Sequence, residues 1–427
     1  MYLAYSLLLS LGLLVLIPHF LFKALAHGKY IAGLRQRLGS IPPVNGKPVI
    51  WLHCVSVGET QAARPLAKRL QQQFPHHALV VSTITRTGQN LARDVFRTQA
   101  ASVFYFPFDW RWTARRALRA INPDAVLIME TELWPNFLRE CKARQIPVAL
   151  VNGRISRQSF RRYNLITFFL RRVLSSLSIA VMQSEMDAER LGALGMPKDK
   201  LFTAGNLKFD AEVAGGLANK TEEIRTRFGL DVGAPLILAA STHSNEEEII
   251  LESIRQHPVR LMIAPRHPER FKEVANLIQQ SGLSWTRRTN PPDPNDTNAT
   301  VILLDTIGEL PATYELAQIV FVGGSIVDKG GHNVLEPAAS GVAIVTGAHT
   351  HNFQTIVELM NDANAIVQLP PLEGCNASAE LAHAFAKLLA NPEERAALGR
   401  RAKQLVTDNQ GAADRTMQLI AGFCTSS

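Results

Sequence analysis

Short apolar runs of strand length alternate with helical patterns along most of this 427-residue chain. Several runs are rich in Val and Ile and apolar on both faces, as buried parallel strands are. Strands are expected at 49–55, 79–85, 103–106, 125–129, 147–151, 179–182, 236–240, 260–264, 300–304, 319–322 and 343–346. Their alternation with helices such as 61–74 and 246–256 predicts an α/β chain built from right-handed βαβ units.

The strand series pauses near residues 205–225, a polar stretch that contains Gly215 and Gly216. The charge changes sign nearby, because residues 1–220 carry 29 Lys and Arg against 13 Asp and Glu, whereas residues 221–427 carry 16 against 24. We therefore predict two doubly wound, Rossmann-like domains, 23–215 and 216–400, followed by a helical segment at 401–427. Two such domains facing a cleft would bind ligands beyond the carboxyl ends of their strands.

The basic front half suggests an anionic partner, either a membrane surface or a phosphorylated substrate. Nucleic acid is disfavoured, because no basic run is interleaved with aromatic residues and no helix-turn-helix or zinc-finger spacing is present. The four cysteines are scattered without a CxxC pair, and the chain has neither HExxH nor a DxD suited to a nucleotide diphosphate. A metal enzyme is therefore disfavoured, and no cofactor is expected.

The N-terminal segment predicts membrane attachment. Residues 2–22 carry no charge, and at ~1.5 Å per residue a helix of this length approaches the thickness of a hydrocarbon core. Lys23, Lys29, Arg35 and Arg37 follow, and no acidic residue occurs before Glu59, which places the body of the protein in the cytoplasm. A cleaved signal peptide is the alternative, but the segment lacks a basic start and a small-residue cleavage site. Residues 1–22 are thus expected to be an anchor, either spanning or monotopic.

The loop after the first expected strand, Ser56-Val57-Gly58-Glu59-Thr60, is a candidate catalytic loop. We expect Gly58 to permit a tight turn and Glu59 to stand at a helix N-terminus. Glu59 could simply favour the helix dipole, or it could act as a general base at the mouth of the cleft. The dipole would lower its pKa and weaken it as a base, whereas burial would raise the pKa.

Two further loops of the front half carry charged residues. Glu130 and Glu132 follow an apolar strand beside Trp134, where they could orient sugar hydroxyls or only solvate a helix start. Lys208 lies near the domain junction, where it could reach a substrate carboxylate or phosphate, or pair with Asp210.

The rear half contains a loop with two doubled glycines, from Gly323 to Pro337. Backbone without Cβ atoms can approach a phosphate closely, and the amides of the following helix turn can bind its oxygens. Asn333 and Glu336 have the spacing of a capping pair, but capping does not explain the glycines. We therefore favour phosphate binding here. Arg266, on a neighbouring loop, offers a planar guanidinium for a phosphate or a base edge. His267 is expected to be a structural hydrogen-bonding residue.

In chain order, the motifs SVGET, METELWPN, GNLKFD, PRHPERF, DTIGEL and GGSxxxKGGHNxLEP, behind an apolar anchor, resemble the bacterial 3-deoxy-D-manno-octulosonic acid (Kdo) transferases of lipopolysaccharide synthesis. The resemblance runs from about residue 29 to the C-terminus. It implies a GT-B fold and an inverting, metal-independent glycosyltransferase at the cytoplasmic face of the bacterial inner membrane. The donor would be CMP-Kdo, and the acceptor would be the lipid A precursor, a tetraacylated glucosamine disaccharide bisphosphate.

The resemblance also implies roles for individual residues. Glu59 would be the proton acceptor, and Ser56, Gly58, Glu130, Glu132 and Lys208 are candidate acceptor or sugar contacts. The CMP-contacting positions would be Pro265, Arg266, Ile307, Gly308, Glu309, Asn333, Val334, Leu335 and Glu336. By analogy with GT-B proteins, the last helix would return to the front domain, while the basic front half meets anionic membrane lipids.

Two alternatives remain. One is another membrane-surface GT-B enzyme with a different nucleotide sugar, such as the N-acetylglucosaminyl transferase of peptidoglycan synthesis, although the KGGHNxLEP stretch argues against it. The other is a GT-B-shaped scaffold without activity, which could lack Glu59 or the nucleotide loops, both of which this chain has.

Overall fold

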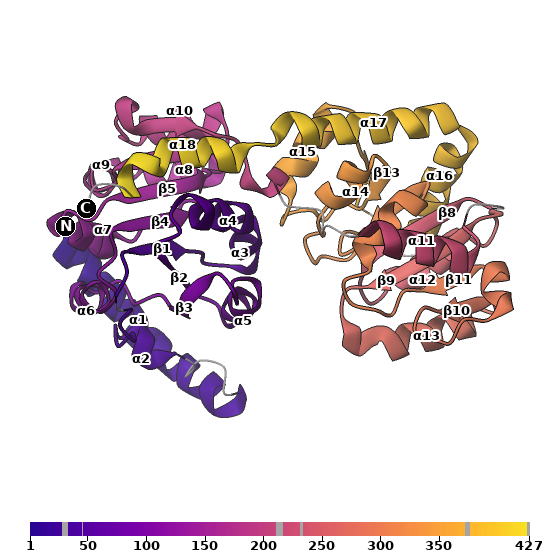
Figure 1. Ribbon diagram of the computed structural model, residues 1–427, viewed down its shortest axis with the longest axis horizontal. Coiled ribbons are helices and arrows are strands. Elements are labelled where there is room, and N and C mark those ends of the chain that lie inside the picture. Colours follow the sequence, from indigo (N-terminus) through magenta and orange to yellow (C-terminus); the bar gives the residue numbers. More distant parts are fainter. Residues whose placement is uncertain (28–32, 45, 211–216, 231–233, 372–375, 425–427) are drawn as a thin grey trace. The chain divides into compact units, whose positions relative to one another are not determined.

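The computed structural model describes residues 1–27, 33–44, 46–210, 217–230, 234–371 and 376–424. The chain forms two compact units (Figure 1). The first unit comprises residues 1–211 and 409–427, and the second comprises residues 212–408. The expected domain junction at residues 215 and 216 lies outside the described residues.

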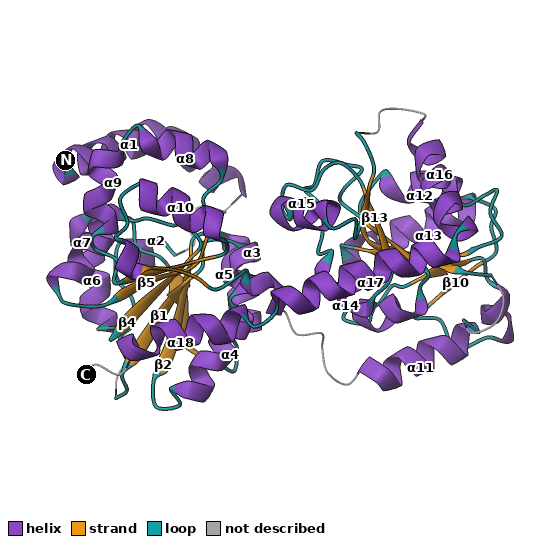
Figure 2. Ribbon diagram, turned by 90° about the horizontal axis from the view of Figure 1, so that it is seen from above, coloured by secondary structure: helices purple, strands orange, loops and turns teal. Residues whose placement is uncertain are grey.

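The first unit is a parallel sheet covered by helices on both faces (Figure 2). Its strand order is β3-β2-β1-β4-β5-β6-β7, so the chain begins in the middle and winds outward in both directions. The strands are β1 (Val49–His53), β2 (Ala78–Thr83), β3 (Ala100–Tyr105), β4 (Ala125–Met129), β5 (Val148–Gly153), β6 (Ile179–Met182) and β7 (Leu201–Thr203).

Successive residues of β1 face opposite sides of this sheet, and each side has its own core. Trp51 packs with Phe104, Phe106 and Phe137 on one side, whereas Ile50 belongs to the cluster on the other side. The covering helices are α3 (Val57–Ala62), α4 (Arg64–Gln73), α5 (Arg86–Val95), α6 (Arg111–Ile121), α7 (Pro135–Ala143), α8 (Arg157–Asn164), α9 (Thr167–Leu174) and α10 (Glu185–Ala193). Short helical segments are α2 (Leu34–Arg37), η1 (Lys198–Lys200) and η2 (Leu207–Asp210).

The N-terminal helix α1 (Tyr2–His27) is bound to the first unit through polar groups on one of its faces. Ser6 accepts a hydrogen bond from the Asn136 amide group, and Ser10 accepts one from the Trp110 indole, both at 3.0 Å. Tyr2 also packs edge-on against Phe169 of α9. Within the described residues, no helix has the length and hydropathy of a membrane span.

The C-terminal helix α18 (Ala412–Cys424) completes the core of the first unit. Its residues Ala412, Met417 and Ile420 are buried in the same cluster as Ile50. Asp210 fixes the start of α18, because its carboxylate accepts hydrogen bonds from the amides of Gly411 and Ala413. Helix α18 is therefore part of the first folding unit.

The second unit is also a parallel sheet with helices on both faces, in the order β10-β11-β9-β8-β12-β13-β14. The strands are β8 (Leu236–Thr242), β9 (Arg260–Pro265), β10 (Trp285–Arg287), β11 (Val301–Leu303), β12 (Ile319–Val322), β13 (Ala343–Thr346) and β14 (Val367–Gln368). The helices are α11 (Leu217–Phe228), α12 (Glu246–Ser253), α13 (Phe271–Gln280), α14 (Leu335–Ser340), α15 (Gln354–Asp362), α16 (Ala377–Ala390) and α17 (Pro392–Asn409). Short 3-10 segments are η3 (Pro268–Arg270), η4 (Pro294–Asn298) and η5 (Leu310–Leu316).

The predicted strands all occur, most with ends shifted by one to three residues, and the sheets contain additional edge strands. The unpredicted strands β7, β10 and β14 have only two or three residues each, too few for a periodic signal. The predicted helix 61–74 is divided in two, because Pro65 stands in the first turn of α4 and a new helix begins there.

Candidate active site

The Glu59 side chain is buried at the start of the helix that follows β1. Ser56 is the N-cap of α3; its hydroxyl donates to Glu59 Oε1 at 3.0 Å and accepts from the Glu59 amide at 3.4 Å. The amide of Val55 donates to Glu59 Oε2 at 2.7 Å. Only 5% of Glu59 is exposed, so the loop after β1 holds a carboxylate in one orientation at the carboxyl edge of the sheet.

Burial dominates the electrostatics of Glu59. Desolvation and then the negative charge of Glu130 raise its pKa from 4.5 to about 8, against the lowering effect of the hydrogen bonds from Val55 and Ser56. The helix start alone would have lowered the pKa, so burial outweighs the dipole. A carboxylate with this pKa is basic enough to accept a proton from a hydroxyl group during its attack.

Gly58 does not make the tight turn that the sequence suggested. It lies in the first turn of α3 and lacks a positive φ, so an L-residue could adopt its backbone conformation. A Cβ atom at this position would meet only the Ser56 hydroxyl, at 3.9 Å. The glycine therefore leaves open space beside Glu59 rather than relieving backbone strain.

Glu130 lies beside Glu59 because β4 is the direct neighbour of β1 in the sheet. Its φ of 53° is unusual for a residue with a side chain, and such strained positions are concentrated at functional sites. Burial and the charge of Glu130 raise the pKa of Glu132 as well. The structure thus brings three predicted carboxylates, Glu59, Glu130 and Glu132, into one electrostatic group.

Lys208 supplies positive charge to this group. Burial lowers its pKa, while the carboxylates of Glu130 and Glu59 raise it. Arg154 adds a second cation, with its Nε 3.9 Å from Glu130 Oε2. The sequence analysis missed Arg154, although its position directly after β5, at the same edge of the sheet, could have identified it.

In the second unit, the first doubled glycine is bound to an internal carboxylate. Glu246 is fully buried and accepts hydrogen bonds from the amides of Gly324, Ser325 and Ile326 at 2.7–3.0 Å, and from the His243 amide at 3.0 Å. Position at the start of α12 alone would let Glu246 interact favourably with the helix dipole. Glu246 instead joins the loops that follow β8 and β12.

The four glycines of this loop each have a structural reason. A Cβ atom on Gly323 would lie 2.9 Å from the Glu246 carboxylate, and one on Gly324 would lie 3.0 Å from the His332 ring. Gly324, Gly330 and Gly331 also have positive φ angles. Close packing and left-handed backbone therefore account for these glycines without a bound phosphate, contrary to the reasoning from sequence.

The predicted pair Asn333 and Glu336 does interact at the start of α14. The Asn333 side chain accepts from the Leu335 amide and donates to Glu336 Oε1, both at 3.0 Å. The buried Tyr314 hydroxyl, which the sequence analysis did not identify, donates to Glu336 Oε2 at 3.2 Å. Val334 and Leu335 are buried beneath this pair, so Glu336 is the member of the motif that presents a polar group in a fixed orientation.

The remaining predicted donor positions also lie after strands of the second sheet. Pro265 ends β9 and is buried, while Arg266 is exposed. Ile307 is 81% exposed, and Gly308 has a φ of 86°. Glu309 is bound by Arg288 at 2.9 Å and Lys220 at 3.2 Å, which leaves the Ile307–Gly308 backbone as the accessible part of this motif.

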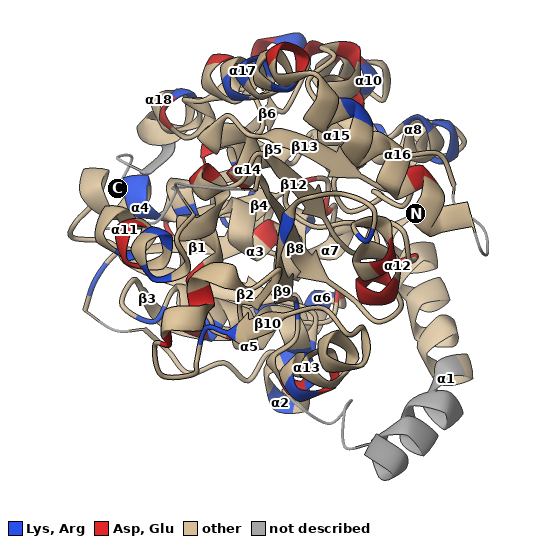
Figure 3. Ribbon diagram, turned by 90° about the vertical axis from the view of Figure 1, so that its right-hand side faces the viewer, with Lys and Arg blue, Asp and Glu red and all other residues tan. Residues whose placement is uncertain are grey.

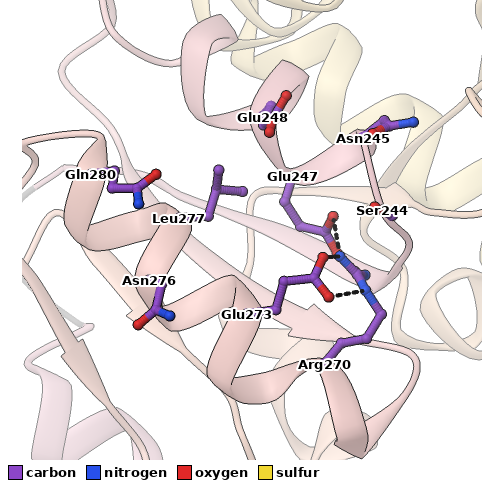
Figure 4. A pocket seen from close by; sticks show the side chains of 9 residues that line it. All are labelled: Ser244, Asn245, Glu247, Glu248, Arg270, Glu273, Asn276, Leu277 and Gln280. Carbon is purple, nitrogen blue, oxygen red and sulfur yellow. Dashed lines mark hydrogen bonds and ion pairs between the residues drawn. The ribbon is translucent and has the colours of Figure 1, made fainter.

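A polar groove lies between α12 and α13, and none of its lining residues is a predicted site residue (Figure 4). Arg270 crosses it and bonds Glu247 at 2.7 Å and Glu273 at 2.7 Å. These bonds connect the loop after β9 to the start of α12. Arg270 and Glu247 therefore have a structural role in holding the loop that carries Arg266 and His267.

Two parallel α/β units with polar loops at the carboxyl edges of their strands define a protein of the GT-B fold class. A solved glycosyltransferase from Rickettsia africae has this fold, with a TM-score of 0.57 at 14% identity, covering 90% of this chain and 100% of that one. Among the described residues, no group of three or more His, Cys, Asp or Glu side chains could hold a metal ion.

Residues 32–211 match the family model of 3-deoxy-D-manno-octulosonic-acid transferase (kdotransferase). The transferase of Haemophilus influenzae is 37% identical, covering 92% of each chain. That of Chlamydophila psittaci is 30% identical, covering 97% of this chain and 94% of the relative. The chain belongs to the family of Kdo transferases, and is thus a glycosyltransferase.

Proposed function

We propose that this protein transfers Kdo from CMP-Kdo to the tetraacylated glucosamine disaccharide bisphosphate of the lipid A precursor, with inversion and without a metal ion. Membership of the Kdo transferase family supports the reaction. The observation that carries the mechanism is Glu59, a buried carboxylate with its pKa raised to about 8 beside open space at Gly58.

In the proposed reaction, an acceptor hydroxyl oxygen attacks the anomeric carbon of Kdo while Glu59 takes its proton. The bond from that carbon to the phosphate oxygen breaks, and its electron pair leaves with CMP. Because CMP is a stable anion, no general acid is required. Glu130, Glu132, Lys208 and Ser56 surround the base and are the proposed contacts of the acceptor or of the transferred sugar.

The donor is proposed to bind in the second unit. Arg266 would bind the phosphate, since its guanidinium forms no ion pair with any described residue. Glu336, held by Asn333 and Tyr314, would accept hydrogen bonds from the ribose hydroxyls. The accessible backbone at Ile307 and Gly308 would contact the nucleotide, with Pro265, Glu309, Val334 and Leu335 shaping the loops.

We also propose that α1 attaches the protein to the cytoplasmic face of the inner membrane. Its polar groups Ser6 and Ser10 are bound to the first unit, whereas its outward apolar side chains are at least 60% exposed: Leu3, Leu7, Leu8, Leu11, Leu14 and Val15. A helix with one face bound to protein and the other apolar is suited to lying in the bilayer interface.

Neighbouring elements extend this surface. Leu165 and Phe168, at the junction of α8 and α9, are 85% and 69% exposed. Helix α8, just before them in the chain, carries three arginines (Figure 3), and each cation near an anionic leaflet contributes about 1 kcal/mol. The same charges would attract the phosphates of the acceptor.

The direct test is transfer itself, with purified protein in detergent, CMP-Kdo generated in situ and the tetraacylated acceptor, followed by mass spectrometry of the lipid. A gain of one Kdo mass would establish donor, acceptor and reaction class, and further gains would count the additions. No gain with intact CMP binding would overturn the acceptor assignment. If the lipid gains no Kdo mass and the protein does not bind CMP, the proposed function is overturned.

A further inference from the structure

We propose that His243 and His332 form an imidazole couple that takes up one proton when the nucleotide phosphate binds, and so stabilises the charge that develops on that phosphate as the sugar leaves. The inference rests on the proposed function, because the phosphate is that of the CMP donor. His243 and His332 are not among the predicted nucleotide contacts, and the inference assigns them the uptake of a proton when the phosphate binds.

The two rings meet edge to edge. Their Nε2 atoms are 2.8 Å apart and their planes differ by only 2°, whereas their centroids are 5.1 Å apart. Coplanar rings at this centroid distance share an in-plane hydrogen bond instead of stacking face to face. His243 follows β8 and His332 belongs to the glycine-rich loop after β12, so the bond joins two loops at the carboxyl edge of the second sheet.

A hydrogen bond between two Nε2 atoms fixes how many protons the couple can hold. One ring must donate and the other must accept. In the neutral couple, the donating ring therefore has a vacant Nδ1 and the accepting ring carries its hydrogen on Nδ1. One further proton can bind at the vacant Nδ1 and leaves the bond intact, but a second would have to occupy the accepting Nε2. The couple thus changes between neutral and singly charged states.

The surroundings of the couple are rich in cations. Burial, followed by the charges of His267, Lys329, Arg270 and Arg266, lowers the pKa of His243 to about 4. Burial and the neighbouring Arg266, His243 and His267 likewise lower the pKa of His332 to about 3. Lys329 and Arg266 form no ion pair with any described residue, and Glu269 is 3.8 Å from His267 at the rim. An anion entering this group would supply the missing negative charge and favour protonation of the couple.

The nearby carboxylate does not supply that charge to the rings. Glu246 directs both oxygens to backbone amides, including those of His243 and Gly324. Gly324 leaves room for both imidazoles, since a Cβ atom there would be 3.0 Å from His332 and 3.4 Å from His243. Glu246 and Gly324 therefore hold the couple in register without neutralising it.

The chemistry of the donor makes a single added proton useful. The donor phosphate is a diester with one negative charge, and cleavage of its bond to the sugar produces a monoester whose second pKa is about 6. The electron pair of the broken bond adds a second charge near neutral pH. A couple that has taken a proton from solvent as the phosphate bound would stabilise this charge.

The test is calorimetric titration of the full-length protein with CMP near pH 7, in two buffers of different ionisation enthalpy. The dependence of the observed heat on the buffer gives the number of protons taken up. We expect proton uptake per bound CMP to be larger in the wild type than in the His243→Gln and His332→Gln variants, by at least about 0.3 proton. Cytidine, which lacks the phosphate, should cause no uptake in any of them.

His383→Gln is the matched control, because His383 is exposed on α16 of the same unit. The proton uptake of this variant on binding CMP should equal that of the wild type. Equal proton uptake in wild type and both variants would overturn the proposal, as would the absence of uptake by the wild type when it binds CMP. Either result leaves the proposed function standing. Failure of the folded wild type to bind CMP would overturn both. If the variants unfold, the deciding comparison is between the two ligands on the wild type. Proton uptake should accompany the binding of CMP but not that of cytidine.

Discussion

The amide of Val55 donates a 2.7 Å hydrogen bond to the carboxylate of Glu59, four residues further along the chain. The loop that presents the candidate base therefore also orients it. Since the Ser56 hydroxyl binds the other carboxylate oxygen, the loop fixes the side chain before any substrate arrives. This arrangement leads to the first two predictions.

Replacement of Glu59 by Gln should abolish proton transfer from the acceptor while keeping the shape of the side chain. We expect kcat to fall by about 10²–10⁴-fold, with CMP affinity changed less than tenfold. Transfer assays and CMP titration measure the two effects. Glu185→Gln, an exposed change at the start of α10, is the control. Near-normal turnover of Glu59→Gln would refute the base assignment.

The pH dependence should carry the signature of Glu59. Because only the ionised carboxylate accepts a proton, kcat/KM should rise with pH up to about 8, the value to which burial raises the pKa. The stability of the folded protein changes with pH in the opposite direction to kcat/KM. A carboxyl group whose pKa is higher in the folded protein destabilises the fold as pH rises from about 4.5 to about 8. Glu59→Gln should therefore lose less stability than the wild type over this range, measured by urea unfolding at several pH values.

Glu246→Gln should loosen the loops after β8 and β12. The amide group of Gln cannot accept the hydrogen bonds that one carboxylate oxygen accepts, so buried amides lose their partners. We expect the free energy of unfolding to fall by about 2–4 kcal/mol, and CMP affinity to decrease. Glu248→Gln, at an exposed position in the same helix turn, should change stability by less than about 0.5 kcal/mol. Equal stability of both variants would argue against the structural role of Glu246.

Glu336→Ala should weaken binding of the donor. The carboxylate is oriented by Asn333 and Tyr314, and its removal eliminates the proposed ribose contact. We expect CMP affinity to fall by about tenfold, since a hydrogen bond to a charged group contributes about 1.5–3 kcal/mol. Titration with CMP measures this loss. Unchanged affinity in a folded variant would exclude a ribose or phosphate role for Glu336.

Membrane binding should depend on the outward face of α1. Changing Leu7, Leu11 and Leu14 to Ser removes exposed apolar area without altering the buried polar contacts of the helix. Sedimentation with vesicles of anionic phospholipid should show at least about tenfold weaker binding. A control triple variant changes Met186, Phe202 and Leu359, which are exposed elsewhere. Comparable loss in both variants would contradict a specific role for α1.

The sheets were predictable from sequence because buried parallel strands are continuous apolar runs, and their loops indicated where Glu59, Glu130 and Glu336 would lie. The contacts among loops were not predictable. Glu246 resembled an ordinary helix start, and its partners Gly324 and Ser325 are nearly eighty residues away. Arg154 gave no signal beyond its position, and the His243–His332 bond depends on a meeting of two loops that no local pattern encodes.

The return of α18 to the first unit has a consequence for how the protein is made. The residues that fill the last part of that core, including Met417 and Ile420, leave the ribosome only after the entire second unit has been synthesised. The second unit can therefore finish folding during translation, whereas the unit that begins the chain waits for its end. Until then, an incomplete apolar surface is exposed on the nascent chain. A premature stop near residue 410 would yield an intact rear unit joined to an unfinished front one.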